Sequence, residues 1–383
     1  MIHYIDELDE KDLRGKKVLL RLDLNVPIVD GKVADDFDIK KVIPTIDFLQ
    51  QKEAKTIIIA HAENKFGKNE SLLPMNDYLR GYFPVDFCST YFSDESKEKL
   101  LNLKDKGVLL LENIRGNPEE KENNDDFAKK LSEMADIYVN DAFGVSHREH
   151  ASIVSLPKFL PHYGGFLMRE EINHLSRVFN PERPFVFILG GAKFDTKLPI
   201  IQKYLERTDF VFVGGALANN IFKTKGFELG TSLVGPVNFD IREMIQNPKL
   251  IIPVDVTVTN PKRETSLKNA NEVANDECIV DAGPKTLKEI EKILVGVKTI
   301  VWNGPLGNYE IGFSDKTESL AEIIAKVTAN GAESIIGGGD TIASIDKLGL
   351  NDKFSFVSTG GGAMLDFLVD ETLPGIEALK TEN

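Results

Sequence analysis

The segment ILGGAKFDTK (188–197) joins an apolar, strand-like run to a helical pattern through two glycines. The same order of features returns in FVGGALANN (212–220), IIGGGDTIAS (335–344) and FVSTGGGAMLDF (356–367). Glycine between a strand and a helix lets backbone N–H groups approach a phosphate at the start of the helix. Four such loops, one with two lysines and one with an aspartate, predict a site for the phosphates of a nucleotide.

Strand-like and helical patterns alternate from one end of the chain to the other. In the first half, apolar runs lie at 17–26, 56–62, 107–114 and 136–143, with helical stretches at 38–51 and 118–135. The second half repeats this order, with KLIIPVDVTV (249–258) among its strand-like runs. Continuous apolar strands separated by helices favour parallel sheets that are covered on both faces. In such sheets, ligands bind beyond the carboxyl ends of the strands.

The composition is that of a globular protein with room for two cores. The chain has 383 residues, of which 42% are hydrophobic and 28% are charged, and this suits two domains. Its net charge of −14 argues against nucleic acid or an anionic membrane surface as a partner. No signal-peptide pattern follows Met1, and no apolar run approaches the roughly 20 residues of a membrane helix. We therefore predict a cytoplasmic protein in which Cys88 and Cys278 are ordinary thiols.

The lysines of the first glycine loop are candidates for binding phosphate. Lys193 and Lys197 are four residues apart, so they share a helix face if the helix begins near Ala192. Two ammonium groups just beyond a pair of glycines can neutralise phosphate charge. The alternative is a solvated lysine pair on a surface helix.

The other loops add polar groups that a nucleotide site can use. Asp340 falls in the first turn of a helix, where it either caps that helix or orients Mg²⁺ on a nucleotide. STGGGA (358–363) can offer several N–H donors to an anion, although three glycines also suit a tight turn. In WNGPLGNYE (302–310), Asn303 and Glu310 could bond a ribose or order a cation.

Polar side chains also follow the strand-like runs of the first half. Asp23 and Asn25 occupy alternate positions of RLDLNVP, which predicts that they share one face of a strand. The groups that follow later runs are Arg115, His147, Arg148 and His150. Together with His61, the histidines could indicate a metal site, but no known carboxylate–histidine spacing is present. Arginine gives planar, bidentate recognition, so an anion pocket is favoured instead.

No P-loop and no protein-kinase motif set is present, so a phosphotransferase would need another scaffold. The motifs taken together strongly resemble the phosphoglycerate kinase family. The segments that carry the resemblance follow the family's order along nearly the whole chain: RLDLNVP, LLENIR, NDAFGVSHREHAS, GGFLM, ILGGAKFDTK, GGALANN, PVDV, DAGPKT, WNGPLG, GGGDT and STGGGAMLDFL. Each segment is modestly specific alone, and the ordered set is very specific.

The resemblance implies an α/β fold of two doubly wound, mainly parallel-sheet domains joined by a helix, with a C-terminal tail that returns to the N-terminal domain. The implied parts are an acceptor domain at 1–165, a linking helix at 166–183, a nucleotide-binding domain at 184–365 and the tail at 366–383. The implied reaction is the reversible, Mg²⁺-dependent, in-line transfer of a phosphoryl group between 1,3-bisphosphoglycerate and ADP, with hinge closure. The implied partners are small molecules, phosphoglycerate and an adenine nucleotide, bound by a monomer.

The resemblance also implies a role for each matching residue. Catalytic roles fall to Lys193, Gly338 and Gly361. The glycerate is expected to contact Asp23, Asn25, His61, Asn64, Arg115 and Arg148. The nucleotide is expected to contact Lys197, Gly214, Gly283, Asn303, Glu310, Gly338, Gly339, Asp340 and Thr341, with Asp340 beside the Mg²⁺ ion. No general base is needed, because the acceptor carboxylate or ADP oxygen is already ionised.

Two arginines of the family's pattern are absent. Asp38 in DDFDI replaces the arginine of DDTRI, and Asn64 in AHAENK replaces the arginine of SHLGRP. An ionised Asp38 would repel the substrate's phosphate, and the loss of a transition-state donor costs roughly 10²–10³ in rate. Asp38 also suits the positive N-terminus of a helix. We hypothesise that Lys40, Lys41 or Lys65 reaches the acceptor's phosphate instead.

Three interpretations remain open on the sequence alone. The first is a glycolytic phosphoglycerate kinase with an altered acceptor site. The second is a kinase of the same fold that acts on another carboxylate or phosphorylated acid. The third is a nucleotide-binding protein with weak or no catalysis. The nucleotide-binding set of Lys193, Lys197, Asp340 and 360–362 is intact, which argues against the third, and Asp38 keeps the second and third open.

Overall fold

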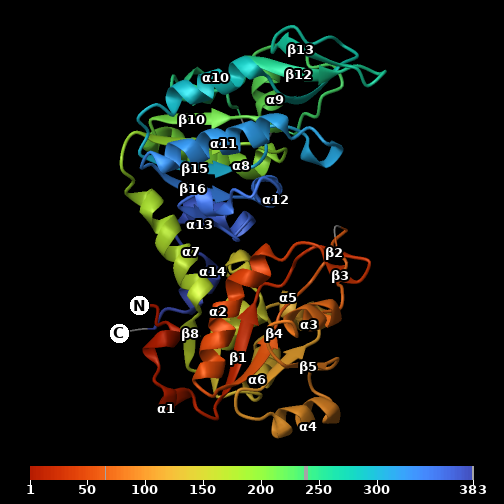
Figure 1. Cartoon of the computed structure of the whole chain (residues 1–383), viewed down its shortest axis with the longest axis vertical. Coiled ribbons are helices and arrows are strands. Elements are labelled where there is room, and N and C mark those ends of the chain that lie inside the picture. The colour runs from red at the N-terminus through yellow and green to blue at the C-terminus, as the bar shows by residue number, and fades with distance from the viewer. Residues whose placement is uncertain (65, 237–239, 382–383) are drawn as a thin grey trace. The chain divides into compact units, whose positions relative to one another are not determined.

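The chain divides into two compact units. The computed structural model describes residues 1–64, 66–236 and 240–381. The first unit is Met1–Asn173 together with Thr372–Asn383, and the second is His174–Glu371. Each unit contains one six-stranded sheet, and Figure 1 labels the helices and strands of both.

The sheet of the first unit has the order β5-β6-β4-β1-β7-β8, and every neighbouring pair is parallel. Its strands are β1 (Lys17–Leu22), β4 (Lys55–Ile59), β5 (Val85–Cys88), β6 (Val108–Leu111), β7 (Ile137–Asp141) and β8 (His162–Gly164). A separate antiparallel pair is formed by β2 (Ile28–Val29) and β3 (Lys32–Val33). The central strands are buried along their length, as their continuous apolar sequences predict.

The helices of the first unit lie before, between and after these parallel strands in the sequence. They are α1 (Glu10–Leu13), α2 (Phe37–Gln51), α3 (Leu73–Leu79), α4 (Asp94–Asn102), α5 (Pro118–Lys121), α6 (Asp125–Ser132) and α14 (Pro374–Ala378). In α2, Ile39, Val42 and Ile46 recur at helical spacing and join the same buried core as Val18 and Leu20 of β1. The α2 helix matches the helical stretch predicted at 38–51 to within one residue.

The sheet of the second unit has the order β11-β10-β9-β15-β16-β17 and is again parallel throughout. Its strands are β9 (Phe185–Leu189), β10 (Phe210–Val213), β11 (Leu250–Ile251), β15 (Thr299–Asn303), β16 (Glu333–Gly337) and β17 (Phe356–Val357). A three-stranded antiparallel sheet is formed by β12 (Asp255–Thr259), β13 (Thr265–Asn269) and β14 (Cys278–Ala282). The helices are α8 (Phe194–Arg207), α9 (Gly215–Thr224), α10 (Pro284–Ile293), α11 (Asp315–Ala329), α12 (Gly339–Lys347) and α13 (Gly362–Asp370).

Two connections confirm the fold that the resemblance implied. Helix α7 (Phe166–Ser176) begins in the first unit, and the chain passes to the second unit within it. The C-terminal segment returns to the first unit, where the Gly375 N–H donates to the Ser146 carbonyl over 2.8 Å and the Met1 amino group donates to the Thr381 carbonyl over 3.2 Å. The predicted α/β class with mainly parallel sheets is therefore confirmed.

Two predicted elements are wrong in extent. The helical stretch at 118–135 is two helices, because Asn123 takes a left-handed φ of 53° and Asn124 then caps α6. The strand-like run at 249–258 is also two strands, β11 and β12, which belong to different sheets. Pro253 lies between them and has no N–H to donate to a ladder, so one continuous strand is disfavoured.

No helix in the described part of the chain is both long enough and apolar enough to cross a bilayer.

Candidate active site

Polar residues of the first unit gather beyond the carboxyl ends of its parallel strands. Asp23 and Asn25 follow β1, and His61 follows β4. Arg115 lies in a short 3-10 turn after β6, and Arg148 follows β7. Because β6, β4, β1 and β7 are neighbours in the sheet, four separate segments deliver these groups to one edge.

The alternation of Asp23 and Asn25 predicted a shared strand face. This prediction is wrong, because β1 ends at Leu22. The Asn25 N–H donates to Asp23 Oδ1 over 3.2 Å, and Asn25 Oδ1 accepts from the Glu63 N–H over 2.8 Å. Asp and Asn side chains that bond nearby backbone compete with strand pairing, which is the physical reason for the error.

Positive charge is concentrated at this edge of the sheet. The buried Arg21 of β1 donates from Nε to Ser152 Oγ over 3.0 Å and from Nη1 to the Leu22 carbonyl. Burial lowers the pKa of His61 well below its ordinary value, and the charges of Arg21 and Arg115 lower it further. Burial and the same two arginines lower the pKa of His150 to about 4. Both imidazoles are therefore neutral at pH 7 and lie in a positive potential.

Several buried polar atoms at this edge have no hydrogen-bond partner among the described residues. They are Arg21 Nη2, His61 Nδ1, Arg115 Nε and His150 Nδ1. Buried polar groups are nearly always satisfied, so a cluster of unsatisfied ones indicates a missing ligand or water. Because the cluster is cationic, an anion is the ligand that fits it.

The Asn64 side chain bonds to the backbone of its own loop rather than to this cluster. Its Oδ1 accepts the N–H groups of Phe66 over 3.0 Å and of Lys68 over 3.1 Å. Its carbonyl accepts the Gly67 N–H over 2.8 Å. The amide side chain thus holds a local turn, as Asn often does.

Asp38 lies in the first turn of α2 and carries a strongly shifted pKa. Burial raises the pKa to about 7, and the negative charges of Asp23, Asp35 and Glu171 contribute in the same direction. The positive charge of Lys41 opposes them. Near neutral pH, this carboxyl group therefore exchanges between its protonated and ionised forms.

The lysines proposed to replace the missing arginines have other contacts. Lys40 Nζ lies 2.8 Å from Asp36 Oδ1, one turn away on α2. Lys41 Nζ lies 5.2 Å from the centroid of the Phe37 ring. Lys65 lies outside the described residues.

In the second unit, each glycine loop leads into a helix, as predicted. The N-cap residues are Lys193 for α8, Gly214 for α9, Gly338 for α12 and Gly361 for α13. Gly338 has a φ of 99° and Gly361 has a φ of 50°. Residues other than glycine rarely adopt such backbone angles. The loops follow strands β9, β10, β16 and β17 of the parallel sheet, so their N–H groups lie at its carboxyl edge.

Lys193 and Lys197 do not share a helix face, because α8 begins at Phe194 rather than near Ala192. Lys193 is exposed and has a non-helical ψ of 83°. Lys197 Nζ turns back to the loop, where it donates to the Gly190 carbonyl over 2.8 Å and to Asn303 Oδ1 over 3.1 Å.

Burial lowers the pKa of Lys197 to about 8. The negative charge of Asp340 raises this pKa and the positive charge of Lys193 lowers it. These couplings mean that the three groups are electrostatic neighbours. A phosphate placed beside Lys197 would restore its positive charge at higher pH.

A cavity of about 240 Å³ in the second unit joins three of these segments. Its lining includes Gly191 and Ala192 of the first glycine loop, Gly215 and Ala216 of the second, Asp340 of the third, and Pro305, Gly307 and Glu310 of the WNGPLGNYE segment. The remaining wall is formed by Asn219, Leu233, Cys278, Ile279, Val280, Asp281, Leu306, Asn308 and Tyr309. Glycine loops, apolar walls and a few polar groups together suit a nucleotide.

Several predicted nucleotide-binding residues do not line this cavity and have structural contacts of their own. Asn303 orients Lys197, and Thr341 Oγ1 accepts the Gly304 N–H over 3.0 Å. Gly214 caps α9, and Gly339 opens α12 beside Asp340. Gly283 caps α10, where an added Cβ would lie 2.2 Å from the Asp255 carboxyl carbon.

Asp340 and Glu310 fit a magnesium ion that is carried by a nucleotide. Burial raises the pKa of Asp340, and the nearby charge of Glu310 raises it further. Among the described residues, no group of three or more His, Cys, Asp or Glu side chains could hold a metal ion alone. Mg²⁺ on a nucleotide needs only one or two protein carboxylates, so this donor set is sufficient.

Three residues of the first cluster escaped the sequence prediction. Arg21 had a signal, because a charged residue inside the apolar run KVLLRL needs buried partners. Glu63 and Lys121 had no signal in the sequence, because their contact joins residues that are 58 positions apart: Lys121 Nζ donates to Glu63 Oε1.

The fold and these two clusters define a class of protein. Parallel α/β units with an anion site in one and nucleotide-binding loops in the other are typical of enzymes that transfer phosphoryl groups. Comparison with known proteins gives the family. Residues 8–371 match the family model described as phosphoglycerate kinase.

Individual relatives agree over almost the full length. The chain is 39% identical over 389 residues to a phosphoglycerate kinase of Dictyoglomus turgidum, covering 98% of each chain. It is 40% identical to one of Thermosipho africanus, covering 96% of each. The solved structure of phosphoglycerate kinase from Coxiella burnetii has a TM-score of 0.82 at 35% identity, with 99% of each chain covered. The structure from Pyrococcus horikoshii has a TM-score of 0.85 at 31% identity, covering 99% of this chain and 98% of that one.

The chain belongs to the phosphoglycerate kinase family. It is therefore a phosphotransferase of glycolysis, with phosphoglycerate and adenine nucleotide as its small-molecule substrates. The family's reaction is the reversible transfer of a phosphoryl group between 1,3-bisphosphoglycerate and ADP, which gives 3-phosphoglycerate and ATP. Neither a different acceptor nor a loss of catalysis is favoured by these relationships.

Proposed function

We propose that the first unit binds the phosphoglycerate and the second binds the nucleotide. The observation that supports the first assignment is the set of buried nitrogen atoms without partners in Arg21, His61 and Arg115. The second assignment is supported by the glycine-loop cavity beside Lys197. The domain bounds that the resemblance implies, an acceptor domain at 1–165 with the tail at 366–383, a linking helix at 166–183 and a nucleotide domain at 184–365, stay a prediction beside the compact units Met1–Asn173 with Thr372–Asn383 and His174–Glu371. Hinge closure stays a prediction.

Within the first unit, each predicted residue has a distinct role in this proposal. Arg115 and Arg148 bind negative charge on the acceptor, and His61 serves as a neutral hydrogen-bonding group. Asp23 and Asn25 orient a hydroxyl of the glycerate. Asn64 contributes through the turn that it holds rather than through a charge.

Within the second unit, transfer depends on positioning and charge stabilisation. Lys193 and the amides at Gly338 and Gly361 stabilise the phosphoryl group as its charge develops. Lys197 and Asn303 hold the nucleotide's phosphates, while the loops that contain Gly214, Gly283, Gly339 and Thr341 shape the site. No side chain needs to remove a proton, because the attacking oxygen is already ionised.

Asp340, with Glu310 nearby, is proposed to hold Mg²⁺ through one or two carboxylates. When bound with the nucleotide, the ion supplies positive charge to its phosphate oxygens. We further propose that the protein is a cytoplasmic monomer that uses neither nucleic acid nor a membrane as partner. The net charge of −14 supports the last point.

The assignment of substrates to units is tested by a pair of variants in an assay coupled to glyceraldehyde-phosphate dehydrogenase. Arg115→Gln is expected to raise the KM for 3-phosphoglycerate and leave that for ATP unchanged. Lys197→Gln is expected to do the reverse. If both variants raised the same KM, the proposed division of labour would be abandoned.

Nucleotide affinity is expected to fall as Lys197 loses its proton. With a pKa of about 8, Lys197 is charged at pH 7 and mostly neutral at pH 9. The Kd for Mg-ADP should therefore rise about tenfold between these pH values. Calorimetry of the wild type and Lys197→Gln measures this, with Lys223→Gln on α9 as the matched control. A steep pH dependence that persists in Lys197→Gln would contradict the assignment.

Acceptor affinity is expected to change with the ionisation of Asp38. Its folded pKa of about 7 lies above the ordinary value of 3.8. The protonated form therefore stabilises the fold at low pH, and this part of the free energy of unfolding is lost as the pH rises through 7. Above that pH the carboxylate repels the acceptor. Asp38→Asn should have nearly the wild-type KM for 3-phosphoglycerate at pH 6 and a KM about tenfold lower than wild type at pH 8. A ratio of the two KM values that is constant across this range would show that Asp38 does not face the acceptor.

A further inference from the structure

Glu63 is held firmly inside the anion site of the first unit. Its backbone N–H donates to Asn25 Oδ1 over 2.8 Å. On the other side it forms an isolated antiparallel bridge with Asn69, whose Nδ2 donates to the Arg115 carbonyl over 2.7 Å. The loop that carries Glu63 is thus tied to two residues of the proposed acceptor site.

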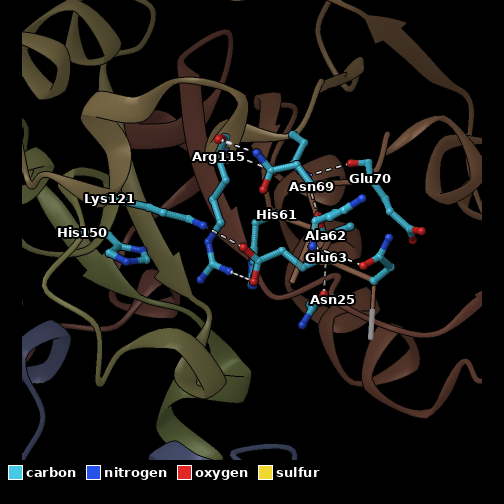
Figure 2. Close-up of polar contacts among 12 residues, drawn as sticks. Asn25, His61, Ala62, Glu63, Asn69, Glu70, Arg115, Lys121 and His150 are labelled. Atoms are coloured by element: carbon cyan, nitrogen blue, oxygen red, sulfur yellow. Dashed lines mark hydrogen bonds and ion pairs between the residues drawn. The ribbon is translucent and has the colours of Figure 1, made fainter. Parts of the chain in front are cut away.

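The carboxylate of Glu63 binds two cations of this site at once. Glu63 Oε2 accepts from Arg115 Nη1 over 2.5 Å, and Oε1 accepts from Lys121 Nζ over 2.8 Å. Figure 2 shows this carboxylate facing both side chains, which come from consecutive elements, the 3-10 turn Ile114–Gly116 and α5. The Arg115 side chain is 8% exposed and that of Glu63 is 19% exposed, so the Arg115 contact is largely shielded from solvent.

Glu63 is ionised at neutral pH. Burial by itself would raise its pKa, but the hydrogen bond from Lys121 and the charge of Arg115 outweigh burial and lower it. Arg115 meanwhile keeps a buried Nε without a partner in the described residues. Its guanidinium therefore offers one edge to Glu63 and retains donor capacity for a second anion.

We propose that Glu63 is an internal counter-ion that competes with the acceptor's phosphate for Arg115 and Lys121, and that Lys121 is a further cation of the acceptor site. A carboxylate between an arginine and a lysine occupies the kind of position that a phosphate oxygen takes in an Arg/Lys site. A substrate anion must displace the Glu63 carboxylate or bind despite repulsion from its negative charge. The affinity for the acceptor is then set by the difference between the two anions. The inference rests on the proposed function, in that the acceptor binds to the first unit.

A purely structural role for Glu63 predicts the opposite result. If Glu63 only held Arg115 in the orientation that binds substrate, its neutralisation would weaken acceptor binding. If Glu63 competes with the substrate, its neutralisation strengthens acceptor binding. The sign of the change in KM therefore separates the two roles.

The experiment compares Glu63→Gln and Lys121→Gln with the wild-type full-length chain. For each variant, kcat and the KM values for the phosphoglycerate acceptor and for ATP are measured, and inorganic phosphate is titrated as a competitive inhibitor. Glu122→Gln and Lys130→Gln change the net charge equally at exposed positions outside the cluster and serve as matched controls. Thermal unfolding shows whether each variant is folded.

Glu63→Gln is expected to lower the KM for 3-phosphoglycerate and the inhibition constant of phosphate about tenfold, since a competing charged hydrogen bond is lost. Lys121→Gln is expected to raise both about tenfold. The KM for ATP should be unchanged in both variants, and the two controls should match the wild type.

Two results would overturn the inference. One is an acceptor KM in folded Glu63→Gln that equals or exceeds that of the wild type. The other is an unchanged acceptor KM in Lys121→Gln. Failure of the proposed function gives a different result, because the acceptor KM would then be unchanged in Arg115→Gln too. If Arg115→Gln raises the acceptor KM while Glu63→Gln leaves it unchanged or raises it, only the counter-ion role of Glu63 is rejected.

Discussion

Lys193→Ala is expected to lower kcat roughly 10²–10³-fold, as the loss of one donor aimed at transition-state charge does in other enzymes. Lys193 is the N-cap of α8 and its side chain is exposed, so it can reach a phosphoryl group in transfer. Its main structural contact is made by the backbone, since its carbonyl accepts from Thr196 Oγ1 over 3.0 Å. Truncation should therefore remove charge without disturbing the fold.

The measurement is kcat at saturating 3-phosphoglycerate and Mg-ATP, with Lys193→Arg as the matched variant that keeps the charge. Lys193→Arg should retain more of the activity than Lys193→Ala, and both should unfold at the wild-type temperature. The loss of an interaction that is made only in the transition state lowers kcat and kcat/KM equally. A raised KM for ATP with an unchanged kcat would instead make Lys193 a ground-state binding residue.

The strand–loop–helix order of the chain could be predicted because it depends on local sequence. Glycines between an apolar run and a helical pattern correctly marked the starts of α9, α12 and α13. The error at Lys193 and Lys197 has a local cause, since α8 begins two residues later than predicted. Helix boundaries are uncertain by this much in any pattern-based prediction, but side-chain direction depends on them.

Contacts between distant segments could not be predicted from one sequence. Glu63 meets Arg115 across 52 residues and Lys121 across 58. Neither spacing is periodic, and Glu63 and Lys121 each have the appearance of an ordinary surface charge in the sequence. Arg21 differs, because its position within the apolar strand β1 could have shown that it was buried.

The two proposed substrate sites differ in the origin of their charge. The nucleotide loops depend on backbone amides and Lys197, so their sequence is strongly constrained by glycine geometry. The proposed acceptor site depends on side chains, which can be exchanged. Asp38 and Asn64 remove expected positive charge there, and Glu63 adds a negative charge. Lys121 returns one cation to the same cluster.

Gly190→Ala is expected to destabilise the second unit by about 2–3 kcal/mol, because the new methyl group cannot be accommodated. An added Cβ would lie 2.1 Å from the Pro305 carbonyl oxygen and 2.5 Å from that of Gly304. Both neighbours are backbone atoms, and the Gly190 N–H is already bonded to the Asn303 carbonyl over 2.9 Å. The loop must therefore move away from the WNGPLGNYE segment.

This movement should also remove nucleotide binding, because Lys197 Nζ is positioned by the Gly190 carbonyl. Thermal unfolding should show a Tm about 5–10 °C lower for the affected unit, and calorimetry should show a Kd for Mg-ADP raised at least about tenfold. Gly235→Ala is the matched control, because its Cβ would lie at ordinary contact distances of 3.7–3.8 Å from Asn220 and Phe194. If Gly190→Ala bound Mg-ADP as tightly as Gly235→Ala does, close approach of these two loops would not be what positions Lys197.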